Sequence, residues 1–217
     1  MTPLRRSPDT SRVLVFSHPN HELAVYGLAQ RLRPHFIFFT DGGSLQRVEQ
    51  GERGLERIGL RERAQFLTYS EAFFYAALLE LDVSLFREVA RRVRECLERI
   101  RGEQVFCDAV EFYNPVHDLT LPIVWAALAG AEHVATFEIP LVYQVPGERE
   151  GYAVQRLPAA RAAGGLALQL TDAELKAKLT ARDETYLLLR NQLGTVLTDL
   201  PDAHFARDEL APAARSS

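Results

Sequence analysis

Short apolar runs alternate with amphipathic stretches along the first part of the chain. Residues 13–16 form an unbroken apolar run, V-L-V-F, which is typical of a strand buried in a parallel sheet. The stretch Leu23–Leu32 has apolar residues at helical spacing and stops before Pro34, as a helix should. A second apolar run, Phe36–Phe39, is closed by the turn sequence T-D-G-G. Strand, helix and strand in this order predict a right-handed crossover unit.

The middle of the chain predicts a loop, three helices and one more strand. Gly51–Gly59 carries three glycines and mixed charge, which we expect in a mobile surface loop. The pattern then predicts helices over Arg61–Leu81 and Ser84–Arg101, and the second has a clear apolar face. Val105–Val110 is a third apolar run and predicts a strand, and Leu121–Leu128 predicts the helix that follows it.

The pattern changes in the last third of the chain. Val134–Val145 and Tyr152–Leu157 alternate enough to predict strands, joined through the hairpin-like turn P-G-E-R-E-G. The sequence T-D-A-E at Thr171–Glu174 is a capping box, which predicts a helix that continues to about Arg190. The residues from Pro201 onwards show little periodicity, and we expect them to be frayed.

These elements predict an α/β fold: a mostly parallel sheet flanked by helices, with a β-hairpin and a helix as a C-terminal extension. The chain has 217 residues, of which 47% are hydrophobic and 25% charged, so it is long enough for one sizeable core. We therefore expect residues 1–200 to form a single domain and residues 201–217 a flexible tail.

Composition excludes several classes of function. The net charge of -4 argues against non-specific nucleic-acid binding, since no positive field dominates. Cys96 and Cys107 form no CxxC pair and are too few for a disulfide framework, so we expect reduced thiols in the core. No signal peptide and no apolar run long enough to span a membrane are found, which favours a cytoplasmic protein.

Histidines and carboxylates follow two of the predicted strands. His18, His21 and Glu22 come directly after the first strand, and His117 and Asp118 lie in the loop after the third. Loops at the carboxyl ends of nearby parallel strands face one crevice, so we expect the three imidazoles to converge. Three neutral imidazoles make a competent Zn²⁺ site with a fourth position for water, whose pKa the metal lowers to about 7.

The first loop also carries a family resemblance. The stretch from Val13 to Gly42 resembles the opening of the LmbE/PIG-L-like de-N-acetylases, which reads strand, H-P-D-D-E, helix, strand, T-D-G. Asn114-Pro115-Val116-His117 falls where that family carries H-P-D-H, and the late helix is similar to the family's K…Y…Q region. The resemblance spans residues 12–195. It implies a Rossmann-like sheet and a zinc hydrolase that removes acyl groups from amino sugars and related amines.

The resemblance assigns roles to the three histidines. His18 matches the first zinc-ligand histidine of the family and His117 the last. His21 occupies the position of an aspartate that is a zinc ligand in the family, and histidine can replace it as a ligand. With three neutral ligands the ion would keep its full charge and act as a stronger Lewis acid.

The chain departs from the family at two positions that handle protons. Asn20 stands where the family has its general-base aspartate, and an amide cannot take a proton near neutral pH. Asn114 replaces a histidine that helps to stabilise the oxyanion; its amide can still donate a hydrogen bond there. Either another carboxylate does the work, or the family reaction is not performed.

Four carboxylates near the expected site are candidates for the missing base: Glu22, Asp41, Glu111 and Asp118. We place Glu22 first and Asp118 second, although Glu22 also suits the start of a helix and Asp118 could orient a ligand or cap the next helix. Asp41 could simply make its turn, and Glu111 could be a surface residue.

The sequence thus favours a metal-dependent hydrolase that cleaves an N-acyl bond of a small molecule such as an amino sugar or a biosynthetic intermediate. The cofactor would be Zn²⁺ or another divalent metal. The alternatives are an inactive, metal-binding relative that holds a small molecule or a partner, and a different metal-assisted reaction. We expect a small-molecule substrate and neither nucleic acid nor membrane as a partner, and homo-oligomer formation is left open.

Overall fold

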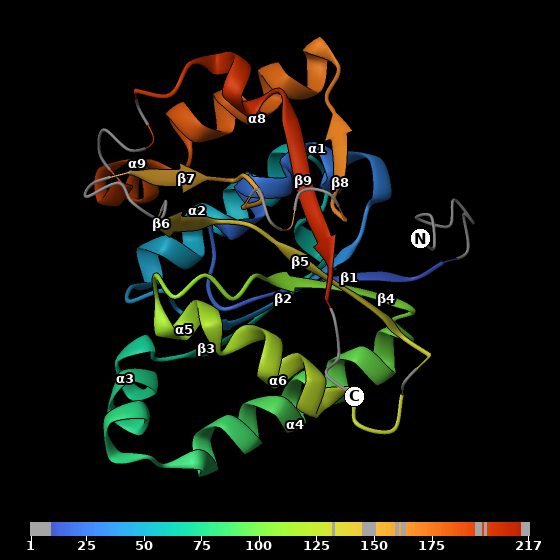
Figure 1. The fold of residues 1–217 in the computed structure, drawn as a ribbon, viewed down its shortest axis with the longest axis vertical. Coiled ribbons are helices and arrows are strands. Elements are labelled where there is room, and N and C mark those ends of the chain that lie inside the picture. Colours follow the sequence, from blue (N-terminus) through green and yellow to red (C-terminus); the bar gives the residue numbers. More distant parts are fainter. Residues whose placement is uncertain are drawn as a thin grey trace.

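A mixed β-sheet between two layers of helices forms the centre of the molecule (Figure 1). The computed structural model describes residues 10–131, 133–144, 151–158, 161, 164–193, 197 and 199–213. Its described strands form a seven-stranded sheet in the order β3-β2-β1-β4-β5-β9-β8 and a separate two-stranded sheet of β6 and β7. The mostly parallel α/β fold expected from the sequence is therefore confirmed.

The parallel part of the sheet is built from five strands. Strand β1 pairs with β2 on one side and β4 on the other, β2 pairs with β3, and β4 pairs with β5. Their bounds are Arg12–Phe16 (β1), His35–Thr40 (β2), Ala64–Tyr69 (β3), Gln104–Asp108 (β4) and Ala135–Ile139 (β5). Because these five strands run in the same direction, their carboxyl ends lie at one edge of the sheet.

Alternate residues of the central strands pack against different helix layers. In β1, Val13 and Val15 belong to the core cluster with α3, α4 and α6, whereas Leu14 and Phe16 belong to the cluster with α1 and α2. All four side chains are fully buried, which is why β1 is an uninterrupted apolar run. The helices of the first layer are α3 (Glu71–Glu80), α4 (Val83–Ile100), α5 (Pro115–Asp118) and α6 (Thr120–Ala127). Those of the second are α1 (Tyr26–Leu32), preceded by the 3-10 turn η1 (His21–Val25), and α2 (Leu45–Arg57).

The prediction of one helix over Arg61–Leu81 is wrong for the first half of this segment. A short 3-10 turn, η2 (Arg61–Arg63), leads into strand β3, and only then does α3 begin. Strand β3 is half-buried at the edge of the sheet, so its apolar residues show no clear strand alternation. Pairing with β2 determines its conformation, and its carboxyl end lies at the same edge of the sheet as the histidines.

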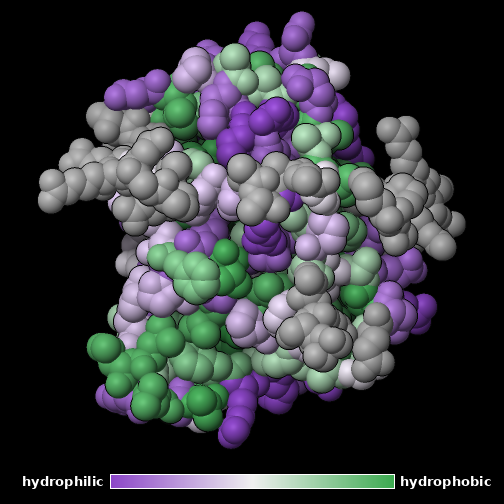
Figure 2. All heavy atoms as spheres, viewed as in Figure 1, coloured by the Kyte–Doolittle hydropathy of each residue, from purple (hydrophilic) through white to green (hydrophobic). Residues whose placement is uncertain are grey.

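Helix α3 gives little sequence signal because it is apolar on more than its buried side. Phe74 and Ala77 are buried, but Phe73 and Leu79 are 66% and 86% exposed. Figure 2 shows the exposed apolar side chains gathered over the part of the surface where α3 lies. The spacing of apolar residues there does not reveal which face of the helix packs inwards.

Gly51–Gly59, expected to be a mobile loop, lies for the most part in helix α2, and that prediction is wrong. The two glycines inside the helix allow other side chains to approach its backbone closely. A Cβ added at Gly51 would lie 2.8 Å from Cβ of Pro19, and one added at Gly54 would overlap the Tyr186 hydroxyl. These glycines are contact points rather than signs of mobility.

The run Val134–Val145 divides into two strands at Pro140. Strand β5 belongs to the large sheet, whereas β6 (Val142–Gln144) pairs antiparallel with β7 (Tyr152–Val154). The expected hairpin is confirmed in these strands, and residues 145–150 of its connection lie outside the described residues.

In the described residues from 164 onwards, the chain forms helices α8 and α9 and strands β8 and β9. The capping box at Thr171 is confirmed at the start of α8 (Asp172–Glu184), but the helix ends before Arg190 and α9 (Leu187–Leu193) follows. Strand β8 (Leu166–Gln169), which the sequence did not predict, pairs with β9. None of the described helices combines the length and the apolar character that crossing a membrane requires.

The expectation of a flexible tail beyond Pro201 is also wrong for residues 201–213. After the 3-10 turn η3 (Asp202–Phe205), strand β9 (Arg207–Pro212) lies inside the large sheet between β5 and β8, antiparallel to both. Its sequence, R-D-E-L-A-P, is polar for a strand inside a sheet. The buried Asp208 is tolerated there because its carboxylate is paired. Lys178 of α8 donates to Asp208 Oδ1 at 2.8 Å and to the Ala24 carbonyl at 3.0 Å, and the Leu28 N–H donates to Asp208 Oδ2 at 2.6 Å.

Replacing Gly54 with alanine tests the contact between α2 and Tyr186. Helix propensity alone would make this change stabilising by roughly 1 kcal/mol. We expect it instead to lower the free energy of unfolding by about 1–3 kcal/mol, because the added methyl group overlaps the Tyr186 hydroxyl. Chemical denaturation measures the change, and Arg53→Ala, at an exposed position of the same helix, is the control. A more stable Gly54→Ala variant would show that the helix does not pack against Tyr186.

Removing the cation of the buried pair tests whether β9 is part of the core. Lys178→Met removes the cation that is paired directly with the buried Asp208 carboxylate, so we expect a loss of about 3–5 kcal/mol in the free energy of unfolding. The matched control is Lys176→Met on the exposed side of the same helix, which should change little. Equal denaturation midpoints for the two variants would contradict the buried pair.

Candidate metal centre

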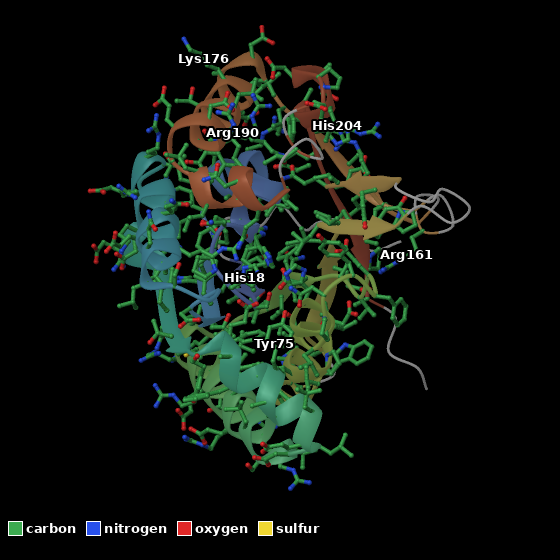
Figure 3. All side chains as sticks on the ribbon, turned by 90° about the vertical axis from the view of Figure 1, so that its left-hand side faces the viewer. His18, Tyr75, Arg161, Lys176, Arg190 and His204 are labelled. Atoms are coloured by element: carbon green, nitrogen blue, oxygen red, sulfur yellow. The ribbon has the colours of Figure 1, made fainter. Side chains whose placement is uncertain are left out.

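The three histidines singled out in the sequence lie together at the carboxyl edge of the parallel strands. His18 and His21 follow β1, and His117 lies in α5, the short helix after β4. One ring nitrogen from each lies within 4.8 Å of those of the other two, and His18 Nε2 is 2.9 Å from His117 Nε2. Figure 3 shows His18 in the interior of the molecule, with Tyr75 of α3 on one side of it. The convergence expected from the two loops is thus seen in the geometry.

Hydrogen bonds orient two of the three rings. His21 Nδ1 lies 2.9 Å from Asp108 Oδ1, and His18 Nδ1 lies 3.1 Å from the Pro19 carbonyl. A ring that donates from Nδ1 presents its Nε2 lone pair to the cluster, which is the usual arrangement of a metal-ligating histidine. The Nδ1 of His117 is buried with no partner among the described residues, and its Nε2 faces His18.

Burial keeps the imidazoles of His18 and His117 neutral. Burial and the neighbouring His21 together lower the pKa of His117 to about 3. Burial and the neighbouring His21 hold the pKa of His18 well below its usual value. Neutral imidazoles carry the lone pairs that a divalent cation needs, and a set of close, buried ring nitrogens suits Zn²⁺ in particular. The residues present therefore fit a divalent metal ion.

Asp108, at the end of β4, is a residue of the site that the sequence analysis missed. Its carboxylate is fully buried and accepts hydrogen bonds from the Ser17 N–H at 2.8 Å and the Thr120 hydroxyl at 3.1 Å, besides its contact with His21. Burial alone would raise the pKa of Asp108, but His21, His117 and the Ser17 N–H hold it below its usual value. The signal was a lone aspartate at the end of an apolar run, hidden inside the predicted strand Val105–Val110.

Asn20 lies in the cavity beside the histidines with its side chain unpaired. Its backbone has φ 85°, in the left-handed region, and its N–H donates to Glu22 Oε2 at 2.8 Å. The side chain is 1% exposed, and neither Oδ1 nor Nδ2 has a hydrogen-bond partner among the described residues. An unpaired buried amide is costly, so this group is one that a ligand would satisfy.

Asn114 lines the same cavity and begins helix α5. Its Oδ1 accepts a hydrogen bond from the Val116 N–H at 2.9 Å, as an N-cap does, and another from the Tyr75 hydroxyl at 3.3 Å. Because the oxygen is occupied in this way, the amide nitrogen remains as a donor towards a ligand. The side chain can therefore donate a hydrogen bond, as the sequence suggested.

The two carboxylates ranked as proton acceptors do not line the cavity. Glu22 is fully buried, accepts from the Tyr186 hydroxyl at 2.8 Å and from the Asn20 N–H, and burial raises its pKa to about 7. Asp118 accepts from the backbone N–H groups of Glu111 and Phe112 at 2.7 and 3.1 Å. In these positions they hold the two loops in shape.

The other two candidate carboxylates also bind backbone groups. Asp41 Oδ1 accepts from the N–H groups of Gly43 at 2.8 Å and Glu71 at 3.0 Å, so it makes the turn after β2. Glu111 accepts from the N–H groups of Leu141 and Val142 at 2.6 and 2.9 Å, and burial raises its pKa to about 8.

The cavity next to the histidines has a volume of about 280 Å³ and two chemically different walls. Arg47, Glu71 and Gln155 are polar residues of the lining. The apolar wall comes from the hairpin region and α9, with Leu141, Val142, Val154, Leu189 and Leu193. The polar end of the cavity therefore holds the histidines, and the other end suits carbon-rich groups.

Arg47 and Glu71 are two cavity residues that the sequence did not point to. The Arg47 guanidinium is 5% exposed; Nη1 donates to the Gly42 carbonyl at 3.2 Å, and Nε has no partner among the described residues. Glu71 Oε1 lies 4.0 Å from His18 Nε2. Both residues belong to segments whose structure was predicted wrongly or left open, so nothing in the sequence placed them at a strand end.

Several solved structures of similar fold are named as deacetylases. A deacetylase of the teicoplanin biosynthesis pathway has a TM-score of 0.70 at 14% identity, over 95% of this chain and 99% of that chain. The zinc-inhibited form of teicoplanin deacetylase has a TM-score of 0.68 at 13% identity, over 95% and 99%. The N,N'-diacetylchitobiose deacetylase from Pyrococcus horikoshii has a TM-score of 0.55 at 18% identity, over 94% and 84%.

The sequence matches no family model and no curated protein. The likeness to the deacetylases is therefore one of three-dimensional fold, and it extends over nearly the whole chain. This chain has an α/β fold like that of known deacetylases, with three buried histidines gathered at the carboxyl edge of its parallel strands.

Proposed function

We propose that this chain is a metal-dependent hydrolase of the LmbE/PIG-L-like type that cleaves the N-acyl bond of a small molecule. The observation that carries the proposal is the convergence of His18, His21 and His117 at the polar end of a cavity. The fold supports it, because several solved structures of similar fold are named as deacetylases. One of them is named for N,N'-diacetylchitobiose, which favours an N-acylated amino sugar as the substrate class.

The three histidines would hold the metal, Zn²⁺ or another divalent ion. When bound, such an ion polarises the acyl carbonyl and lowers the pKa of a water molecule. The hydrogen bond between the Asp108 carboxylate and His21 Nδ1 orients the His21 ring and keeps it directed towards the cluster. The histidine at this position therefore has the support that a ligand needs.

The two asparagines are the groups best placed to bind the acyl group. Asn20 offers a free amide beside the histidines, and Asn114 offers its amide nitrogen from the start of α5. Either N–H could donate to the carbonyl oxygen, where negative charge develops as water adds to the acyl carbon. The remainder of the substrate would lie along the apolar wall of the cavity, with Arg47 and Gln155 available for its hydroxyl groups.

A second candidate function is a binding protein with the same fold and metal site. The observation that favours it is Asn20, since an amide at this position cannot accept the proton that hydrolysis releases from water. Such a protein would hold an N-acyl compound without cleaving it.

Removing one histidine tests the metal-dependent hydrolase. We expect His117→Ala to lose bound metal, measured by elemental analysis, and to lose turnover of N-acetyl amino sugars by a factor on the order of 100 or more, because a ligand matters more than the groups that orient it. His133→Ala, at an exposed histidine, should keep both. Deacetylation that persists without metal would reject this mechanism.

Converting Asn20 to aspartate separates the hydrolase from the binding protein. If the chain is a hydrolase, we expect acyl release from N-acetyl amines by the natural sequence, with Asn20→Asp changing the rate by about tenfold or less, since the site already has its proton acceptor. The control is Asn191→Asp, an exposed asparagine of α9. Acetate release that appears only in Asn20→Asp would identify the natural protein as a non-catalytic relative.

A further inference from the structure

Glu71 is the carboxylate whose position matches the proton-handling task left open at Asn20. It is the first residue of α3, directly beyond the end of β3, and its side chain is 14% exposed. Among the described residues that line the cavity it is the only carboxylate, and its Oε1 lies 4.0 Å from His18 Nε2. We propose that Glu71 is the general base and acid of the hydrolysis, an assignment that rests on the proposed function.

The backbone around Glu71 is held firmly enough for such a role. The Glu71 N–H donates to Asp41 Oδ1 at 3.0 Å, and the same oxygen accepts the Gly43 N–H at 2.8 Å. The turn after β2 thereby fixes the start of α3, and with it the direction of the Glu71 side chain. The carboxylate oxygens accept no hydrogen bond from the described residues, so they remain available to a water molecule in the cavity.

The other carboxylates nearby are committed to different bonds. Glu22, Asp41, Glu111 and Asp118 all accept hydrogen bonds from backbone N–H groups, and none of the four lines the cavity. Each of them would therefore have to move, and give up these loop-holding hydrogen bonds, before it could accept a proton in the cavity. The Glu71 carboxylate makes no such hydrogen bond with the described residues, which is why the geometry favours it as the proton acceptor.

The proposed step balances in protons and electron pairs. Glu71 takes a proton from water as the water oxygen forms its bond to the acyl carbon and the carbonyl π pair moves to oxygen. The carbonyl then re-forms, the C–N bond breaks with its electron pair on nitrogen, and Glu71 returns the proton to that nitrogen. The products are a carboxylic acid and a free amine, and Glu71 ends as a carboxylate.

Glu71→Gln in the metal-loaded protein is the direct test, because it keeps the size of the side chain and removes its basicity. We expect kcat for an N-acetyl amino sugar to fall by about 10²–10⁴-fold, with KM changed little. Zinc titration of the metal-free protein by calorimetry should give the same stoichiometry and affinity as the natural sequence. Glu80→Gln, an exposed glutamate at the other end of α3, is the matched control.

Two further measurements distinguish a proton acceptor from a residue that only shapes the cavity. Formate should restore part of the activity of Glu71→Ala, since it can supply a carboxylate in the vacated space. The double variant Asn20→Asp with Glu71→Gln should recover activity relative to Glu71→Gln, because it places another carboxylate in the lining of the same cavity. Both tests measure activity that is regained by a protein already lacking Glu71. Poor folding of such a variant could lower its activity but could not produce this gain.

Several outcomes would overturn the assignment. A loss of zinc affinity in Glu71→Gln would make this residue a ligand, and a raised KM at constant kcat would make it a binding residue. Undiminished kcat would exclude it from proton transfer while leaving the hydrolase proposal intact. Absence of hydrolysis in the natural protein is a different result: it refutes the proposed function, and the role of Glu71 with it.

Discussion

The buried carboxylate of Asp108 is the group on which the geometry of the site depends. It binds the Ser17 N–H at the end of β1, the ring of His21 in the next turn and the hydroxyl of Thr120 in α6. The loop after β1, the end of β4 and the start of α6 thus share one negative charge in a place that water does not reach. Burial of such a charge is tolerated because donors surround it, and the same donors fix the loop that carries two of the three histidines.

Much of the fold and the centre of the site were predictable because they follow from strong local patterns. The apolar runs of β1, β2 and β4 are buried on both faces, and a parallel sheet brings their carboxyl ends, and so His18 and His117, to one edge. Where the pattern was weak, the prediction failed. Strand β3 is half-buried at an edge of the sheet. Strand β9 has a polar sequence, which is compatible with burial because Asp208 forms an ion pair with Lys178 of α8. Only the tertiary contacts determine these two strands.

The same limit applies to the residues around the histidines. The identity of Asn20 was evident in the sequence, but the burial of its unpaired amide is a property of the folded loop. Glu71 could not be placed while β3 was interpreted as helix, since a residue in mid-helix carries no information about a strand end. The sequence analysis therefore placed Glu22 and Asp118 first, which hold loops, and passed over the carboxylate that lines the cavity.

The place of β9 in the sheet has a consequence for the order in which the chain can fold. During synthesis the helices and parallel strands emerge first, but β5 keeps an open edge of unpaired backbone groups until residues 207–212 have left the ribosome. Lys178 likewise lacks its ion-pair partner Asp208 until this strand has been synthesised. Nascent chains would therefore expose this strand edge until β9 has been synthesised, and chaperones that cover exposed strands would matter most before that moment.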